Sequence, residues 1–196
     1  MSKDKQAKRN SILNAALATF VKRGFHGASM AYIAEEAGVC SCTIDDYFES
    51  KDDLIRGLCR EVEARMTKKL QSSYKKDLPY KERYLTFFTG VLNYLVNNPT
   101  ESRFLDQFYS SSFGVEKARH EREHPELYKS DLFYSIINEG IEQRIIKETL
   151  GAEAACALIL SPLVLVSNPR ITSFIKVDNA LMKEVVSATW DAVAKR

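Results

Sequence analysis

Two cysteines and two aspartates lie within the stretch SMAYIAEEAGVCSCTIDDYFESK, residues 29–51. Cys40 and Cys42 stand where a helix is expected to begin, and a helix N-terminus stabilises a thiolate, so the pair could sense redox state. They could also be small residues with no redox role, and their Cys-x-Cys spacing argues against a zinc site. Asp45 and Asp46 could accept a hydrogen bond from cytosine N4, or could be solvated acids without a special role.

The same stretch carries side chains suited to contacts with a phosphate backbone. Lys51 offers a positive charge, and Thr43 and Tyr47 offer hydroxyl groups. We therefore predict that this stretch binds DNA. The predicted DNA-facing residues are Ser29, Ser41, Cys42, Thr43, Asp45, Asp46, Tyr47 and Lys51.

The rest of the sequence offers no recognisable catalytic grouping. No Ser-His-Asp or Cys-His arrangement, no paired buried carboxylates and no phosphate-binding glycine loop is visible. His120 and His124 lie in a charged segment, where we expect them to be solvated. The sequence therefore predicts a protein that is not an enzyme and that needs neither a cofactor nor a metal.

A helix-turn-helix is expected to position the DNA-facing residues. Apolar residues recur at intervals of three and four, so the chain should be all-α. The pattern predicts a helix over 30–37 capped by Ser29, a turn at Gly38, and a second helix over 41–48. A preceding helix over 5–23 should cover their inward face and complete a three-helix unit. In such a motif the second helix lies in the DNA major groove.

Charge is unevenly distributed along this unit. Residues 1–23 hold six basic residues and one acid, whereas residues 29–53 hold one basic residue and seven acids. The net charge of the whole chain is only +2, which by itself says nothing about nucleic acid. Attachment to DNA would therefore depend on the basic N-terminal arm, on Lys51 and on hydroxyl groups.

The remainder of the chain predicts a second, larger helical unit. A long fourth helix opens at a capping-box variant, residues 50–53, and runs to about Tyr74. Further helices are expected over 80–96, from Pro99 to before Ser110, over 125–143, over 152–166, and from Asp178 to about 194. The charged segment 116–126 is either a loop or an exposed helical extension.

The apolar run 154–166 is interrupted by Ser161 and Pro162 and is too short to span a bilayer. It therefore predicts a buried helix and no membrane anchor. The four cysteines do not form the framework of a disulfide-stabilised domain and fit a reducing compartment. Both observations predict a cytoplasmic protein.

Aromatic residues are dense in the C-terminal half and could line a ligand cavity or simply fill the core. Aromatic stripes at helical spacing are usually core. The residues chosen as cavity candidates are Phe88, Leu92, Phe104, Phe108 and Phe133. Their character would suit an apolar or aromatic ligand.

The run ILNAALATFVKRGFHGASMAYIAEEAGVCSCTIDDYFESKDDL resembles the N-terminal domain of the TetR (tetracycline-repressor-like) family. It shares an Ala-Ala…Phe helix, a Gly-aromatic turn, an Ile-Ala…Ala-Gly-Val segment and a Phe-x-x-Lys-x-x-Leu ending. The resemblance implies a DNA-binding domain at residues 6–66, with its motif at 29–48, and a helical ligand-binding and dimerisation domain at 67–196. It also implies a homodimer that pairs through its last two helices, a palindromic operator, and a repressor released by a small molecule.

Departures from the family pattern fall on the DNA face. Ala28, Ala31, Cys40, Cys42 and Asp45 stand where the family usually has Thr, a basic residue, Ser, Gly or Ala, and Tyr. A carboxylate near phosphates is repelled at close range. Two hypotheses therefore stay open: a ligand-responsive repressor, and a dimer of the same fold that binds ligands or partners with weakened or lost specific DNA binding.

Overall fold

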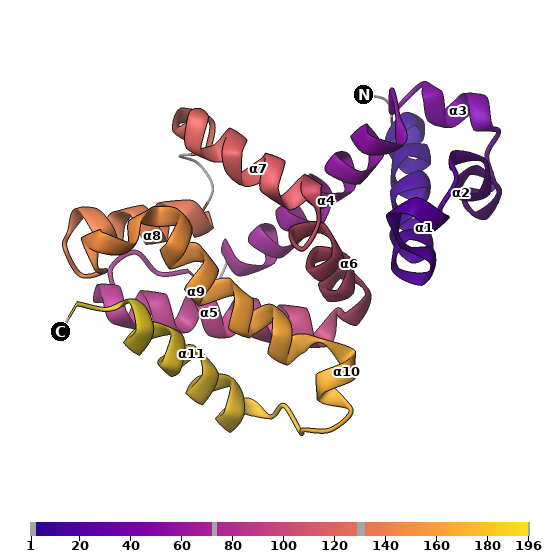
Figure 1. Cartoon of the computed structure of the whole chain (residues 1–196). Coiled ribbons are helices and arrows are strands. Elements are labelled where there is room, and N and C mark those ends of the chain that lie inside the picture. Colours follow the sequence, from indigo (N-terminus) through magenta and orange to yellow (C-terminus); the bar gives the residue numbers. More distant parts are fainter. Residues whose placement is uncertain (1–2, 72–73, 129–131, 196) are drawn as a thin grey trace.

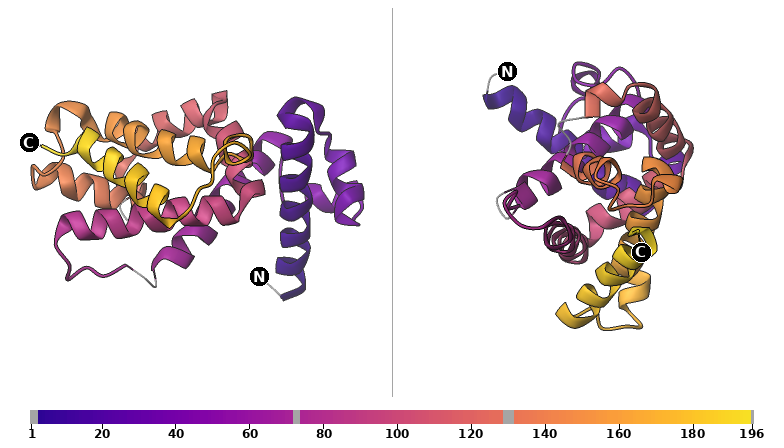
Figure 2. Two further views of the ribbon diagram at one scale, coloured as in Figure 1. Left: turned by 90° about the horizontal axis from the view of Figure 1, so that it is seen from below. Right: turned by 90° about the vertical axis from the view of Figure 1, so that its left-hand side faces the viewer.

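The computed structural model describes residues 3–71, 74–128 and 132–195. Within these ranges the fold is all-α, as predicted, and its extended pairing is limited to an isolated antiparallel bridge between Ile146 and Ala194. The first three helices form a compact unit at one end of the molecule, and the other helices form a bundle at the opposite end (Figures 1 and 2). Helix α4 runs from one unit into the other.

The N-terminal unit consists of α1 (Lys3–Gly27), α2 (Met30–Ala37) and α3 (Ser41–Asp45). Their inward stripes meet in a core that excludes solvent almost completely. This core contains Ile12, Leu13, Ala16, Phe20, Ile33, Ala34, Ile44 and Phe48. The predicted three-helix arrangement is thereby confirmed.

Backbone hydrogen bonds at the helix ends explain why α2 begins and ends where it does. Ser29 Oγ accepts a hydrogen bond from the Tyr32 amide at 3.1 Å, so the predicted N-cap is present. Gly38 adopts a left-handed conformation with φ of 66°, which lets its amide donate to the last carbonyls of α2. This glycine makes the turn between the two helices of the motif.

Helix α4 (Lys51–Gln71) opens with the predicted capping box. Ser50 Oγ accepts from the Asp53 amide at 3.1 Å, and the Asp53 carboxylate accepts from the Glu49 amide at 3.4 Å. The helix buries Leu54, Leu58 and neighbouring apolar residues in the N-terminal half of its length. It is thus held firmly by the N-terminal unit before it enters the C-terminal bundle.

The C-terminal bundle buries a second set of apolar and aromatic side chains. The Tyr84 ring of α5 contacts the tilted ring of Phe88 and meets Trp190 of the last helix edge to face. The elements of the bundle are α5 (Tyr80–Asn97), α6 (Pro99–Tyr109), α7 (Ser112–Glu123), the 3-10 helix η1 (Pro125–Tyr128), α8 (Leu132–Glu142), the 3-10 helix η2 (Glu148–Leu150), α9 (Gly151–Ser167), α10 (Pro169–Thr172) and α11 (Asn179–Val193).

Two predicted helices have different bounds in the structure. The second helix of the motif ends at Asp45 rather than Phe48, because the amides of Tyr47 and Phe48 both donate to the Ile44 carbonyl in a tight turn that carries Phe48 into the core. The predicted helix over 125–143 is not continuous: Pro125 opens only η1, and α8 begins at Leu132, with 129–131 outside the described residues.

The prediction that the apolar run 154–166 is a buried helix is wrong. Only the stripe Ala155, Ile159, Leu163 and Ser167 of α9 is buried, whereas Leu165 is 60% exposed. The stretch Glu148–Ser167 is long and apolar enough to cross a membrane by length and composition, and 17% of it is buried. The helix therefore presents an apolar face that the rest of its own chain does not cover.

Candidate DNA-binding surface and ligand cavity

The predicted DNA-facing residues lie together on the outer end of the N-terminal unit. Side chains at positions 29, 41, 42, 45 and 46 are exposed, and those of Thr43, Tyr47 and Lys51 are partly buried. Lys51 Nζ donates to the Ala28 carbonyl at 3.3 Å, which ties α4 to the segment before α2. An ammonium group has three donors, so this bond leaves Lys51 able to meet a phosphate.

The recognition helix α3 carries negative and no positive charge. Its sequence SCTID contains no Lys or Arg, and Asp46 follows directly. Within the described chain, neither Asp45 nor Asp46 forms an ion pair. The sequence did not predict the placement of Arg23. Its guanidinium lies over the Tyr32 ring, 3.9 Å from the ring centroid, and holds a positive charge beside α2.

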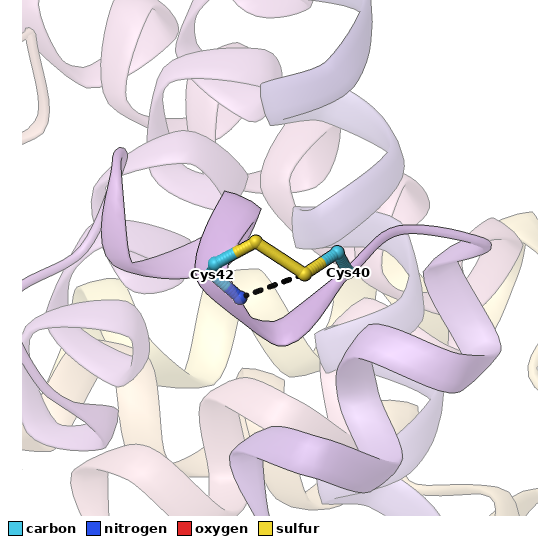
Figure 3. Close-up of a disulfide and its surroundings, with 2 residues drawn as sticks. All are labelled: Cys40 and Cys42. Atoms are coloured by element: carbon cyan, nitrogen blue, oxygen red, sulfur yellow. Dashed lines mark hydrogen bonds between the residues drawn. A yellow bond between two sulfur atoms is a disulfide. The ribbon is translucent and has the colours of Figure 1, made fainter.

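Cys40 and Cys42 are joined by a disulfide at the start of α3 (Figure 3). Cys40 is also the N-cap of this helix, and its Sγ accepts from the Cys42 amide at 3.3 Å. Cys59 is buried and Cys156 is partly exposed. The structure thus brings together the two cysteines that the sequence singled out.

A cavity of about 650 Å³ lies in the C-terminal bundle between helices α4 to α9. Of the five candidate ligand residues, Phe133 lines this cavity. Phe88 and Leu92 are fully buried in the bundle core. Phe104 packs against Phe20 of α1, so it joins the two units, and Phe108 stacks beside it.

One end of the cavity is polar, which the sequence did not reveal. Lys117 of α7 forms ion pairs with Glu63 of α4, at 3.3 Å, and with Glu121 of α7. The Tyr109 hydroxyl donates to Glu63. Burial opposes the charge on Lys117, but Glu63 and Glu121 outweigh it and raise the pKa of the ammonium group. Burial and then Glu63 raise the pKa of Tyr109 well above its usual value.

A second polar network joins α4 to both α1 and α6. Glu61 of α4 pairs with Arg9 of α1 at 3.2 Å and with Arg65 at 3.2 Å. Arg65 also reaches Glu101 of α6 at 3.3 Å. Consequently α4 is bonded by ion pairs to the DNA-binding unit on one side and to the wall of the bundle on the other.

Two family models match this chain over its length. Residues 12–58 match the model described as bacterial regulatory proteins of the tetR family, and residues 79–194 match the tetracyclin repressor-like C-terminal domain. The second match alone covers more than half of the 196 residues. The chain belongs to the TetR family of transcriptional regulators.

Two known proteins resemble the chain along nearly all of its length. The fatty acid metabolism regulator protein of Bacillus subtilis is 23% identical over 190 residues, which span 94% of this chain and 97% of that protein. The crystal structure of a TetR-family regulator from Marinobacter aquaeolei superposes with a TM-score of 0.80 at 19% identity and covers 100% of both chains.

Another similar solved structure has a named ligand. The Bacillus subtilis regulator FadR, in complex with stearoyl-CoA, superposes with a TM-score of 0.68 at 21% identity and covers 93% of this chain and 95% of that one. At this identity the likeness shows a shared fold. Relatives named as transcriptional regulators mark this TetR-family chain as a DNA-binding regulator of a non-enzymatic family.

Proposed function

We propose that the protein is a cytoplasmic transcriptional repressor that binds a palindromic operator as a homodimer and is released by a small apolar or aromatic molecule. The observation that carries this proposal is that one helix belongs to both working regions. Leu54 and Leu58 of α4 pack into the DNA-binding unit, while Met66 and Thr67 of the same helix line the cavity. The proposal assigns DNA binding to residues 6–66 and ligand binding with dimerisation to 67–196.

Helix α4 is the expected lever because a helix transmits displacement along its length. A ligand that pushed on Met66 would tilt α4, and the Arg9–Glu61 pair would carry that tilt into α1. The recognition helices of a dimer must enter major grooves about 34 Å apart, or multiples of that distance. A small change in their separation therefore lowers affinity for the operator.

Exposed apolar residues on α9 and in the segment between α10 and α11 support the homodimer. Leu158 and Leu165 of α9 are exposed, and Phe174, between α10 and α11, is 86% exposed. A patch of this kind on a regulator is characteristic of a protein interface. Because a two-fold axis places the same surface on both subunits, α9 and α11 are expected to pack against their counterparts.

DNase footprinting of the upstream region of the protein's own gene tests the DNA-binding proposal. We expect two protected half-sites at low salt and protection that falls as salt rises. The homodimer is tested by light scattering of the purified protein, with Leu165→Glu as the disrupting variant. The control is Lys22→Glu, which is exposed on α1 rather than on α9 or α11. No protection at low salt, or a monomeric wild-type protein at micromolar concentration, would contradict the proposal.

The exposed acids of α3 favour a second candidate function. A dimer of this fold that binds a ligand or partner, with weakened specific DNA binding, would tolerate Asp45 and Asp46. The Asp45→Tyr variant discriminates between the two. A large gain in DNA affinity together with no wild-type footprint supports this second function, whereas a strong wild-type footprint rejects it.

A further inference from the structure

The cavity combines apolar walls with an excess of negative charge. Apolar side chains of α4, α5, α6 and α9 form most of its surface, among them Met66, Val91 and Leu105. The acidic residues that line it are Glu63, Asp106, Glu121 and Glu153, and the basic residues are Lys117 and Arg122. The acids thus outnumber the bases, in contrast to the nearly neutral chain as a whole.

Part of this excess charge lies on side chains that are only partly exposed. Glu63 and Glu121 share a single ammonium group, that of Lys117, and these three side chains are only 21%, 28% and 21% exposed, respectively. The Tyr109 hydroxyl helps to solvate Glu63, but it is neutral. One carboxylate charge therefore remains unbalanced in a poorly solvated region, where electrostatic interactions are stronger than in water.

An anionic ligand would add to this imbalance, and a cationic one would remove it. A carboxylate or phosphate placed near Glu63 and Glu121 would be repelled and would lose its own hydration. An ammonium or amidinium group would gain a charge-assisted hydrogen bond to either carboxylate. The remaining walls are apolar, so the rest of the ligand must be apolar as well.

We propose that the effector is an apolar molecule carrying one positive charge, and that its cation binds beside Glu63 and Glu121. The proposal rests on the proposed function and names the chemical class of its ligand. Because Glu63 belongs to α4, such a ligand contacts the lever directly. It would share Glu63 with Lys117 and so weaken the ion pair that joins α4 to α7.

Three probes with the same ten-carbon chain test this inference by isothermal titration calorimetry, without DNA and below their micelle concentrations. They are decylammonium, which carries N–H donors, decanol and decanoate. For the wild-type protein we expect the cation to bind about tenfold more tightly than decanol, and decanoate to bind more weakly than decanol. Decanoyl-CoA, as an acyl-CoA of the kind held by the FadR relative, should behave like decanoate.

The Glu121→Gln variant keeps the size of the side chain and removes one charge. It should lower affinity for the cation about tenfold and leave affinity for decanol unchanged. Glu116→Gln is the matched control, because Glu116 is another ion-paired acid of α7, bonded to Arg56 at 2.7 Å, but does not line the cavity. Circular dichroism and thermal melts establish that both variants are folded.

Several outcomes would overturn the inference. These are equal or tighter binding of decanoate or decanoyl-CoA, equal binding of decanol and the cation, no binding of the cation at millimolar concentration, or an unchanged preference in Glu121→Gln. Each leaves the proposed function standing if the footprint is present and an anionic or neutral probe releases the DNA. If the footprint is absent but the protein still prefers the cation, the repressor function is rejected and the proposed class of ligand stands.

Discussion

The recognition helix and the ligand cavity both carry an excess of acids, but in opposite surroundings. Asp45 and Asp46 are exposed on α3, without an ion pair in the described chain. Glu63 and Glu121 are mostly buried and share Lys117. An exposed carboxylate is solvated by water at little energetic cost, whereas an enclosed one depends on its protein partners.

This difference in surroundings predicts which property, binding or folding stability, each set of acids should affect. Removal of charge from α3 should change what the protein binds and leave its folding stability almost unchanged. Removal of charge from the cavity should change both stability and ligand choice, because the partners left behind lose their compensation. The predictions below test this contrast.

The largest effect is expected for Lys117→Met. This change leaves Glu63 and Glu121 without their shared counter-charge, and we expect the free energy of unfolding to fall by about 3 kcal/mol. Urea denaturation measures it. Exposed Lys183→Met is the control and should change stability by less than about 0.5 kcal/mol.

A second substitution separates lost packing from unbalanced charge. In the double variant Lys117→Met with Glu63→Gln, one carboxylate charge is also gone, so we expect more than half of the lost stability to return. If the double variant is as unstable as Lys117→Met alone, the enclosed acids do not need their counter-charge and the contrast with α3 fails.

A one-to-one ion pair whose residues do not line the cavity provides a sharper reference. Arg83 of α5 is largely buried and binds Glu139 of α8 in a bidentate pair, with one nitrogen–oxygen distance of 2.8 Å. Its hydrogen bonds to Arg83 lower the pKa of Glu139. We expect Glu139→Gln to lower the free energy of unfolding by about 2 kcal/mol at neutral pH, as measured by urea denaturation.

The pH dependence of that loss has a definite sign. Because the pKa of Glu139 is lower in the folded protein, its stabilisation is complete above the unfolded value of about 4.3 and disappears as pH falls through the folded value. The stability difference between wild type and Glu139→Gln should therefore shrink in acid. A difference that stays constant down to pH 3 would contradict this account.

Local sequence signals predicted the N-terminal unit well. The helix caps at Ser29, Gly38 and Ser50 form hydrogen bonds with residues only a few positions away. Their spacing in the sequence was therefore sufficient to predict where these helices begin or end. The predicted helix end at Phe48 was wrong because core packing of that ring turns the chain after Asp45.

The cavity could not be predicted in the same way. Its polar end joins Glu63 of α4 to Lys117 of α7 and to Tyr109 of α6, which is 46 residues away in sequence. Phe104 is as aromatic as Phe133 of the cavity wall, yet it packs on Phe20 of α1. The exposure of α9 depends on which of its faces the bundle covers, and its uniformly apolar sequence does not distinguish them.

On the recognition helix, the double variant Asp45→Asn with Asp46→Asn tests the exposed side of the contrast. Two negative charges facing phosphates are removed, so affinity for an unrelated duplex should rise about tenfold at low salt. Fluorescence anisotropy measures it, and Glu184→Gln, exposed on α11, is the control. An unchanged affinity for unrelated DNA, with a weaker affinity for the footprinted operator, would show that the acids read bases instead.

The smallest effect concerns the disulfide at the start of α3. The bridge fixes the N-cap and the first turn of a helix of only five residues, and a free thiol caps a helix weakly. We therefore expect the oxidised protein to bind DNA about threefold more tightly than the reduced protein, a difference comparable to a weak N-cap.

An oxidant titration followed by fluorescence anisotropy measures this difference in a Cys156→Ala background, which removes the partly exposed thiol of the cavity wall. The buried thiol of Cys59 has a raised pKa, from burial first and then Glu63, so it should react slowly. Cys42→Ala is the matched control and should not respond to the oxidant. If wild type and Cys42→Ala respond alike, the bridge does not regulate the recognition helix, and only the acids distinguish this surface.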